Sequence, residues 1–298
     1  MKNEKIKVIF AFLAIYIFWG STYLANKYAI EFIPPFIMTG FRFIIAGSLL
    51  LSFLTIKNNA FPSIKTWKEP SIVGFLMLFL GNGFIVLAQK KVPSGLTAVL
   101  ISITPLYMSI LSRFINKNNK LKLLEITGII LGTFGVLLLF YNNTDQNISD
   151  GSLFSMIIIL ASSFAWASGA LYSKYKSTDN NSFMPIAQQM ICGGLLLLLL
   201  ATIKSEWSEF DIHNISNESI LSLLYLIVFG SLVGYSSYIW LLKRCNPSLV
   251  STNTFINPVI ALILGAVIAR EPLSLYIIIA SFIIISSLII ITVSHLKR

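Results

Sequence analysis

The chain has 298 residues, of which 56% are hydrophobic and only 11% are charged, and its formal net charge is +10. Soluble domains contain about 25% charged residues, so this composition excludes an ordinary soluble enzyme or binding domain. The positive charge does not indicate nucleic acid as a partner, because the basic residues are dispersed among short segments between long apolar blocks.

Ten apolar blocks of roughly membrane-spanning length predict ten helices in a lipid bilayer. The first block follows a basic segment, as in a signal peptide, but it continues toward Lys27 and more spans follow, so we expect an uncleaved helix. In chain order, the predicted helices lie near 8–29, 33–55, 71–89, 95–115, 122–141, 152–173, 182–203, 219–242, 248–268 and 273–293. The sequence therefore predicts an all-α polytopic membrane protein without a soluble domain.

The distribution of Lys and Arg predicts the orientation of the chain in the membrane. If the N-terminus is inside, sixteen basic residues fall in cytoplasmic segments and four in outer segments, while Lys27 and Arg42 lie within spans. Cytoplasmic loops of membrane proteins carry the excess of basic residues. We therefore expect both termini to be cytoplasmic.

The two halves of the chain resemble each other. A shift of 147 residues places Trp19 on Trp166, Ser21 on Ser168 and Lys27 on Lys174, and a shift of 153 places Pro105 on Pro258. Collinear matches over several helices indicate a duplication, with repeats expected at 1–145 and 146–298. Because each repeat has five helices, the second enters the membrane in the opposite sense. Two inverted five-helix repeats are typical of secondary transporters, which bind substrate between the repeats.

Several short motifs, in order along the chain, point to a known family. They are Phe18-Trp19-Gly20-Ser21-Thr22, Gly40-Phe41-Arg42-Phe43, Gly81-Asn82-Gly83, Val92-Pro93-Ser94-Gly95-Leu96, Asn257-Pro258-Val259 and Arg270-Glu271-Pro272-Leu273-Ser274. The chain resembles the EamA-type permeases of the drug/metabolite transporter superfamily. This resemblance implies a bacterial inner-membrane protein that exports or exchanges small metabolites, such as amino acids or related compounds, without ATP. Glu271 matches a glutamate of that family, whereas the corresponding place in the first half, near Asn118, has no acid.

Arg42 lies well inside the second predicted helix, where a charge is costly unless it faces protein or water. It is either a contact for a substrate carboxylate or a structural arginine bonded to helix-end carbonyls.

Lys27 and Lys174 fall near opposite membrane faces, and each either extends to the lipid headgroups or stands at one mouth of a central pathway. Trp19 and Trp166 lie about two turns deeper, where an interfacial aromatic belt does not explain them. They either line the cavity or pack between helices. Ser21 and Ser168 beside them serve either close helix contact or the cavity wall.

Asn82, Asn253 and Asn257 are further candidates for the cavity, because an amide in a bilayer needs a polar partner. Tyr235, Tyr238 and Trp240 give the predicted helix 219–242 an aromatic character suited to a flat or apolar part of a substrate, and Tyr23 is a further cavity candidate. No Asp or Glu lies in the middle of a span, which argues against a simple proton-carboxylate antiport and favours facilitated passage, exchange, or an ion held by carbonyls and hydroxyls.

We find no Walker loop, GxSxG or HExxH motif, and we expect neither an enzyme nor a cofactor or metal site. The favoured function is a metabolite transporter working by alternating access, with its cavity formed by helices 1–4 and 6–9. Helices 5 and 10 would be peripheral and could form a homodimer. Two alternatives remain: a carrier of sugar-linked or phosphorylated metabolites, and a membrane scaffold that does not transport.

Overall fold

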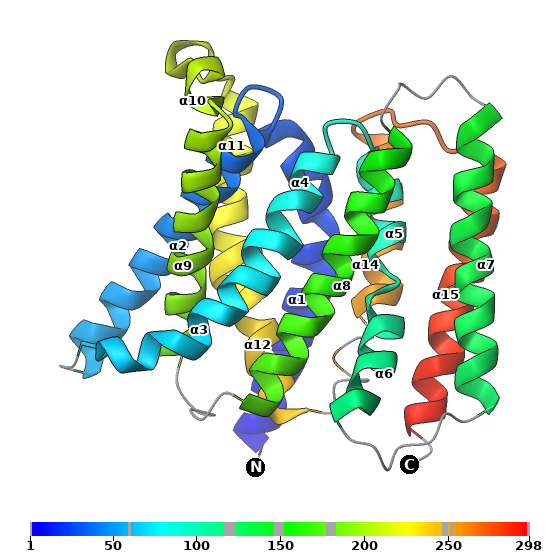
Figure 1. Ribbon diagram of the computed structural model, residues 1–298, viewed down its shortest axis with the longest axis horizontal. Coiled ribbons are helices and arrows are strands. Elements are labelled where there is room, and N and C mark those ends of the chain that lie inside the picture. Colours follow the sequence, from blue (N-terminus) through cyan, green and yellow to red (C-terminus); the bar gives the residue numbers. More distant parts are fainter. Residues whose placement is uncertain are drawn as a thin grey trace.

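The computed structural model describes residues 2–58, 61–115, 123–145, 152–176, 183–245, 250 and 253–296, and the regular elements in these ranges are all helices (Figure 1). Seven helices are long and apolar enough to cross a membrane, and three shorter apolar helices accompany them. The prediction of ten spans is therefore confirmed. Large apolar side chains such as Phe53 and Phe282 point outward, as expected where lipid is the solvent.

The first five spans form one half of the molecule. They are α1 (Lys2–Ala29), α2 (Pro35–Asn58), the continuous series α3 (Lys68–Val73), η2 (Gly74–Gly83) and α4 (Phe84–Ala88), the pair α5 (Ser94–Ile101) and α6 (Thr104–Ile115), and α7 (Leu123–Asp145). A short 3-10 helix, η1 (Ile64–Trp67), precedes α3.

The second half follows the same plan. Its spans are α8 (Ser152–Lys176), α9 (Met184–Ile203), the series α11 (Asn217–Tyr225), η4 (Leu226–Tyr235) and α12 (Ser236–Arg244), α14 (Asn253–Val267) and α15 (Leu275–Leu296). The connection between α9 and α11 contains α10 (Glu206–Glu209) and η3 (Ile212–Asn214). The predicted boundary at 145/146 adjoins residues 146–151, which lie outside the described ranges, so it stays a prediction.

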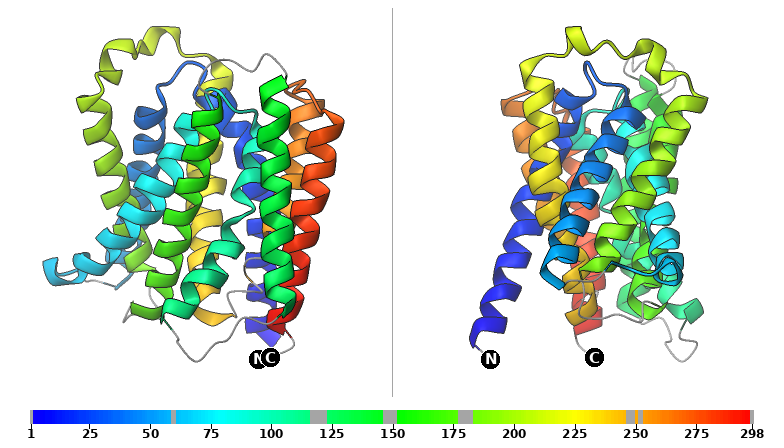
Figure 2. Two further views of the ribbon diagram at one scale, coloured as in Figure 1. Left: turned by 45° about the vertical axis from the view of Figure 1, so that its right-hand side comes forward. Right: turned by 90° about the vertical axis from the view of Figure 1, so that its left-hand side faces the viewer.

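The two halves run through the bundle in opposite directions. The helix α1 begins at the face that carries both chain termini, which we call the terminal face, whereas α8 begins at the other face, which we call the opposite face (Figures 1 and 2). The most extensive contacts join helices of different halves: α2 with α9, α7 with α15, α1 with α14, and α8 with η2. The fold is thus a pair of inverted, interleaved five-helix repeats.

Two predicted helices are not regular α-helices throughout. The predicted helix 95–115 is interrupted at Ser102 and Ile103, because Pro105 lacks an amide hydrogen and its ring clashes with the carbonyl four residues earlier, that of Ile101. The spans through Asn82 and through Gly230 contain the ten-residue π-helices η2 and η4, which the hydropathy pattern does not reveal. Such widened turns are frequent at functional sites.

Candidate functional site

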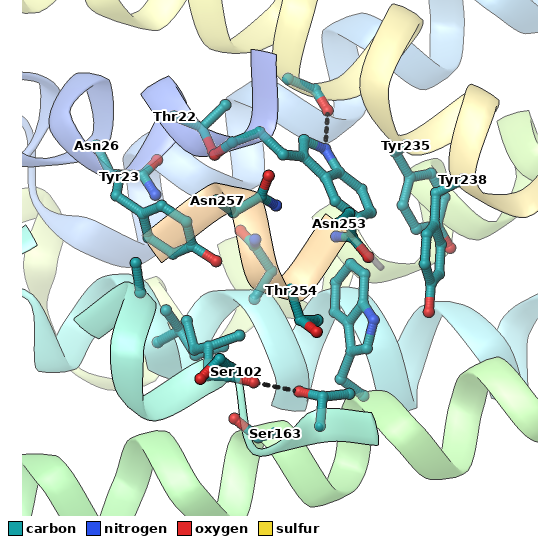
Figure 3. Close-up of a pocket in the computed structure, with 18 of the residues that line it drawn as sticks. Thr22, Tyr23, Asn26, Ser102, Ser163, Tyr235, Tyr238, Asn253, Thr254 and Asn257 are labelled. Atoms are coloured by element: carbon teal, nitrogen blue, oxygen red, sulfur yellow. Dashed lines mark hydrogen bonds between the residues drawn. The ribbon is translucent and has the colours of Figure 1, made fainter. Parts of the chain in front are cut away.

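A cavity of about 90 Å³ lies between the two repeats and is lined by residues of both (Figure 3). The lining residues come from α1, α2, η2, α4, α5, α6, α8, η4, α12 and α14, with Ser102 between α5 and α6. Among the described residues, α7, α9 and α15 contribute none. The seventh predicted helix, 182–203, corresponds to α9, so the expectation that it borders the cavity is wrong. The volume is well below the about 300–1,000 Å³ of typical small-molecule sites.

One face of α1 supplies a continuous strip of the cavity wall. Trp19, Thr22, Tyr23 and Asn26 all line the cavity, and their spacing of three or four residues places them on the same side of a helix. Trp19 and Tyr23 were predicted from the sequence, whereas Thr22 and Asn26 were not. The helical spacing from Trp19 would have identified both.

Four aromatic side chains from α1, α8, η4 and α12 form a cluster on the cavity wall. The ring centroids of Trp19 and Trp166 are 5.7 Å apart at an interplanar angle of 77°, and Tyr238 lies 4.9 Å from Trp19 and 5.9 Å from Trp166. Tyr235 lies 6.1 Å from Trp166, and its hydroxyl donates to Gln189 Oε1 at 2.7 Å. The repeated tryptophans thus meet at the interface of the repeats, and their edge-on contacts define an apolar surface with fixed geometry.

Arg42 is the only lining residue among the described ones whose side chain carries a charge at neutral pH. It is 3% exposed, its Nε donates to Ser231 Oγ at 2.8 Å, and its Nη1 donates to Asn26 Oδ1 at 3.4 Å. These partners are neutral, and no carboxylate lies within ion-pair distance among the described residues. A buried guanidinium without a counter-ion favours an anionic ligand group at the cavity wall.

Two glycines of η4 make room for the principal side chains of the cavity. A methyl group on Gly230 would lie 2.7 Å from Arg42 Nη2, and one on Gly234 would lie 2.6 Å from Trp19 Nε1. The Gly230 carbonyl also accepts the hydrogen bond of Trp19 Nε1 at 3.1 Å. Because these two glycines of the π-helix have no side chain, Arg42 and Trp19 can pack directly against its backbone.

The three predicted asparagines all line the cavity, in different ways. The hydrogen-bond network orients the Asn257 amide so that its nitrogen faces the carbonyls of Ile15 and Tyr16 at 3.1 and 3.0 Å, while its oxygen accepts from Asn253 Nδ2 at 3.2 Å. Asn257 thereby joins α14 to α1. The side-chain oxygens of Asn82 and Asn253 are buried without a hydrogen-bond partner. Since a buried acceptor without a partner is costly, both oxygens are suited to accept from a ligand donor.

Ser21 and Ser168 do not line the cavity, which corrects their selection from the repeat. Ser21 Oγ forms hydrogen bonds with Tyr225 Oη at 2.6 Å and with the Phe18 carbonyl at 2.8 Å. Ser168 Oγ donates to the Phe164 carbonyl of its own helix. Ser102, Ser163 and Thr254 line the cavity instead (Figure 3), although the hydroxyls of Ser102 and Ser163 donate to the carbonyls of Val99 at 2.6 Å and Ile159 at 2.8 Å. Ser163 precedes Trp166 by one helical turn, a spacing that would have identified it.

The two predicted mouth lysines bind protein groups rather than extending freely to the headgroups. Lys27 Nζ lies 3.1 Å from Glu271 Oε1. Lys174 Nζ donates to the carbonyls of Leu242 at 2.9 Å and Cys245 at 3.2 Å. Neither lysine lines the cavity, so the cation available to a bound ligand is Arg42. The described residues contain no group of three or more His, Cys, Asp or Glu side chains arranged for a metal ion.

Comparison with known proteins identifies relatives over almost the whole chain. The profile of the EamA-like transporter family matches residues 6–141 and 153–293. The uncharacterized inner membrane transporter YedA of Escherichia coli strain K12 is 34% identical over 265 residues, covering 89% of this chain and 83% of that protein. The uncharacterized transporter YoaV of Bacillus subtilis is 24% identical over 98% of this chain and 99% of its own length. A solved crystal structure with 17% identity superposes with a TM-score of 0.70 over 98% of this chain and 99% of that one, which shows a common fold.

Proposed function

Because the chain belongs to the EamA-like transporter family and is therefore a membrane transporter, we propose that it exports or exchanges a small amino-acid-like metabolite by alternating access. The scaffold alternative is set aside by family membership. The observation that carries the proposal is the pairing of one buried cation, Arg42, with the aromatic cluster of Trp19, Trp166, Tyr235 and Tyr238 around one cavity. A substrate with one carboxylate and an apolar or aromatic portion matches that pairing in charge and shape.

The unpaired oxygens of Asn82 and Asn253 suit the amino group of such a substrate, because they accept hydrogen bonds without adding a charge. A phosphorylated or sugar-phosphate substrate fits less well. Such a group carries close to two negative charges, whereas the lining of the cavity offers the single guanidinium of Arg42.

The described residues of the lining include no Asp or Glu, so we propose exchange or facilitated passage as the mode of transport rather than proton antiport through a cavity carboxylate. We also propose that the terminal face is cytoplasmic and that the protein lies in a bacterial inner membrane, since the basic residues concentrate in the segments of that face. Alkaline phosphatase fused after Arg298 should be inactive if this orientation is correct. A homodimer through α7 and α15 stays a prediction.

The deciding experiment is uptake and counterflow in proteoliposomes with a panel of radiolabelled amino acids, aromatic carboxylates and phosphorylated sugars, each with and without a pH gradient. We expect counterflow of at least one amino acid or aromatic carboxylate and no requirement for the gradient. Arg42→Gln should lower transport of that substrate by about 10- to 150-fold, since a charge-assisted contact contributes about 1.5–3 kcal/mol.

Lys57→Gln is the control, because Lys57 is exposed at the terminal end of α2, far along the same helix from Arg42. Its transport should equal that of the parent protein. Movement of the phosphorylated sugars alone, or of no panel member, would overturn the proposal.

A further inference from the structure

A buried carboxylate joins three helix ends at the opposite face. Glu271 lies in the segment between α14 and α15, and its side chain is 6% exposed. Its Oε1 accepts from Lys27 Nζ at 3.1 Å and from the Ser94 amide at 2.9 Å. Its Oε2 accepts from Ser94 Oγ at 2.9 Å and from the Gly95 amide at 3.1 Å. One carboxylate therefore receives four hydrogen bonds, including two from the N-terminus of α5, where a negative charge is favoured.

This cluster joins the ends of three helices that line the cavity. Lys27 lies near the end of α1, Ser94 begins α5, and Glu271 follows α14. A methyl group on Gly265 of α14 would lie 2.5 Å from Glu271 Oε2, so α14 makes room for the carboxylate. Lys27 and Ser94 belong to the first repeat and Glu271 to the second, so the contact connects the two halves that must separate for the cavity to open at this face.

The cluster lies directly beyond the cavity. Asn26, a lining residue, immediately precedes Lys27. Asn26 Nδ2 donates to Gln89 Oε1 at 3.1 Å, and Gln89 Nε2 donates to the Tyr23 carbonyl at 3.1 Å. This buried amide pair forms a layer between the cavity and the ion pair. A substrate leaving toward the opposite face between α1 and α5 would have to break both the Asn26–Gln89 pair and the Lys27–Glu271 pair.

The repeat-related contact at the terminal face is chemically different. Lys174, the counterpart of Lys27, donates to the neutral carbonyls of Leu242 and Cys245. The position related to Glu271 is Asn118, whose structure lies outside the described residues but whose side chain carries no charge. Charge-assisted hydrogen bonds are stronger than bonds between neutral groups, and at Lys174 only the donor is charged. The contact of Lys174 therefore lacks the charged acceptor that Lys27 has.

We propose that Lys27, Ser94, Gly95 and Glu271 form a latch that keeps the cavity closed to the opposite face, and that its release is a step of the transport cycle. The latch favours closure at this face, because Lys27 binds a carboxylate whereas its counterpart Lys174 binds neutral carbonyls. This inference rests on the proposed alternating access and adds the group that controls one of its two openings.

The charge state of Glu271 supports this role. Burial acts to raise the pKa of its carboxyl, but the hydrogen bonds from the Ser94 and Gly95 amides, Lys27 and the Ser94 hydroxyl outweigh it, so the pKa is below its usual value. A lowered pKa means that the latch is fully formed above the ordinary glutamate pKa of about 4.3 and is lost only as the pH falls through the lower value. The latch is thus intact at neutral pH and needs a conformational change for release.

The test is sided thiol labelling of a cavity reporter in the full chain, which requires no known substrate. Cys192 and Cys245 are replaced by Ala, and Ala98→Cys places a reporter on α5 in the cavity lining. A membrane-impermeant maleimide is applied to sealed vesicles of each orientation. Glu271→Gln should raise the labelling rate from the opposite face by about tenfold and lower it from the terminal face, because the new amide nitrogen cannot accept two of the four bonds and the other two lose the negative charge.

Three further variants keep the test decisive. Lys27→Met should give a smaller change in the same direction, since the three bonds from Ser94 and Gly95 remain. Ser94→Ala removes one bond and should act likewise, which covers the case that Glu271→Gln fails to fold. Glu209→Gln, at an exposed acid of the same face, should change nothing. If both Glu271→Gln and Ser94→Ala are labelled like the parent, the latch is refuted, whatever the transport assay shows. If the protein transports a panel member but these variants show no change in labelling, the latch is refuted and the proposed transport function is retained.

Discussion

Gly234 gives a sharp test of how η4 positions the aromatic cluster. A methyl group on this residue would lie 2.6 Å from Trp19 Nε1 and 2.7 Å from Trp19 Cδ1. The indole must retreat by about 1 Å to regain ordinary van der Waals separation. That movement would break the hydrogen bond from Nε1 to the Gly230 carbonyl, which is now 3.1 Å long. Gly234→Ala should therefore displace Trp19 without any change to Trp19 itself.

The expected cost combines overpacking and the lost hydrogen bond. Overpacking typically costs about 1–3 kcal/mol, and a buried carbonyl left without its donor costs about 1–3 kcal/mol, so Gly234→Ala should lower the free energy of unfolding by about 2–6 kcal/mol. In a Trp19→Phe background the indole nitrogen is absent and the bond is already lost. There, the added methyl group should cost less than about 1 kcal/mol, giving a strong coupling in a double-mutant cycle.

The assay is reversible unfolding in mixed micelles, followed by near-UV circular dichroism for the four chains of the cycle. Gly83→Ala is the matched control at the end of the other π-helix, η2, where the new methyl group would meet chiefly the terminal methyl of Leu197, a group that is able to rotate away. It should cost little and show no coupling to Trp19→Phe. If the effects of Gly234→Ala and Trp19→Phe simply add, then Gly234 does not act through Trp19 and the reasoning is wrong.

Two further predictions concern the cavity wall and the α9–α11 connection. Trp19→Ala and Trp166→Ala should each lower transport at least tenfold, because each removes several ring contacts of the cluster. The controls Ser21→Ala and Ser168→Ala should transport normally. Normal transport by both tryptophan variants would show that the tryptophans are packing residues only. Burial raises the pKa of Glu206 above its usual value, and this effect outweighs the hydrogen bonds from the Ile37 and Phe36 amides and the charge of nearby Lys90. The contribution of Glu206 to stability is therefore fully present below the ordinary glutamate pKa and is lost as the pH rises through the raised pKa. The difference in melting temperature between the parent and Glu206→Gln should therefore shift against the parent from about pH 4 to pH 7, and a shift in the parent's favour would contradict this sign.

The sequence predicted the spans and the repeat because both depend on patterns that survive without coordinates. Apolar length identifies a membrane helix, and collinear matches such as Trp19 with Trp166 identify a duplication. The π-helices were missed because their residues are as apolar as those of the α-helices around them. The interruption at Ser102 could have been predicted from Pro105, because a proline inside a helix breaks the hydrogen-bond pattern of the preceding turn.

The candidate site was predicted in part, for a different reason. Trp19, Tyr23 and Arg42 were identified because their side chains are unusual within an apolar span, and all three line the cavity. Ser21 and Ser168 were selected because they recur in both repeats, but a repeated serine also satisfies its own helix, as both do here. Lys27 and Glu271 are 244 residues apart in sequence, so local spacing could not pair them. Only the crossing of α1, α5 and α14 brings them together.

Both repeats contribute a tryptophan to the cavity but they differ in charge, and this difference bears on how the transporter works. The shift of 147 residues that relates Trp19 to Trp166 places Arg42 on Gln189, a neutral residue that accepts from Tyr235. Arg42 lies seven residues from the start of α2, or about 10 Å along its axis, which puts it in the half of the bundle nearer the opposite face.

The Glu271 latch closes the same half. A carboxylate bound at Arg42 would then add a negative charge on the cavity side of the Asn26–Gln89 layer, with the Lys27–Glu271 pair on its other side. That charge would attract Lys27 away from Glu271 and weaken the latch in proportion to occupancy of the cavity. The bound substrate should therefore raise labelling of the Ala98→Cys reporter from the opposite face in the parent but leave it unchanged in Lys27→Met. An equal rise of the labelling rate in both proteins would show that a charge bound at Arg42 does not act on the latch through Lys27.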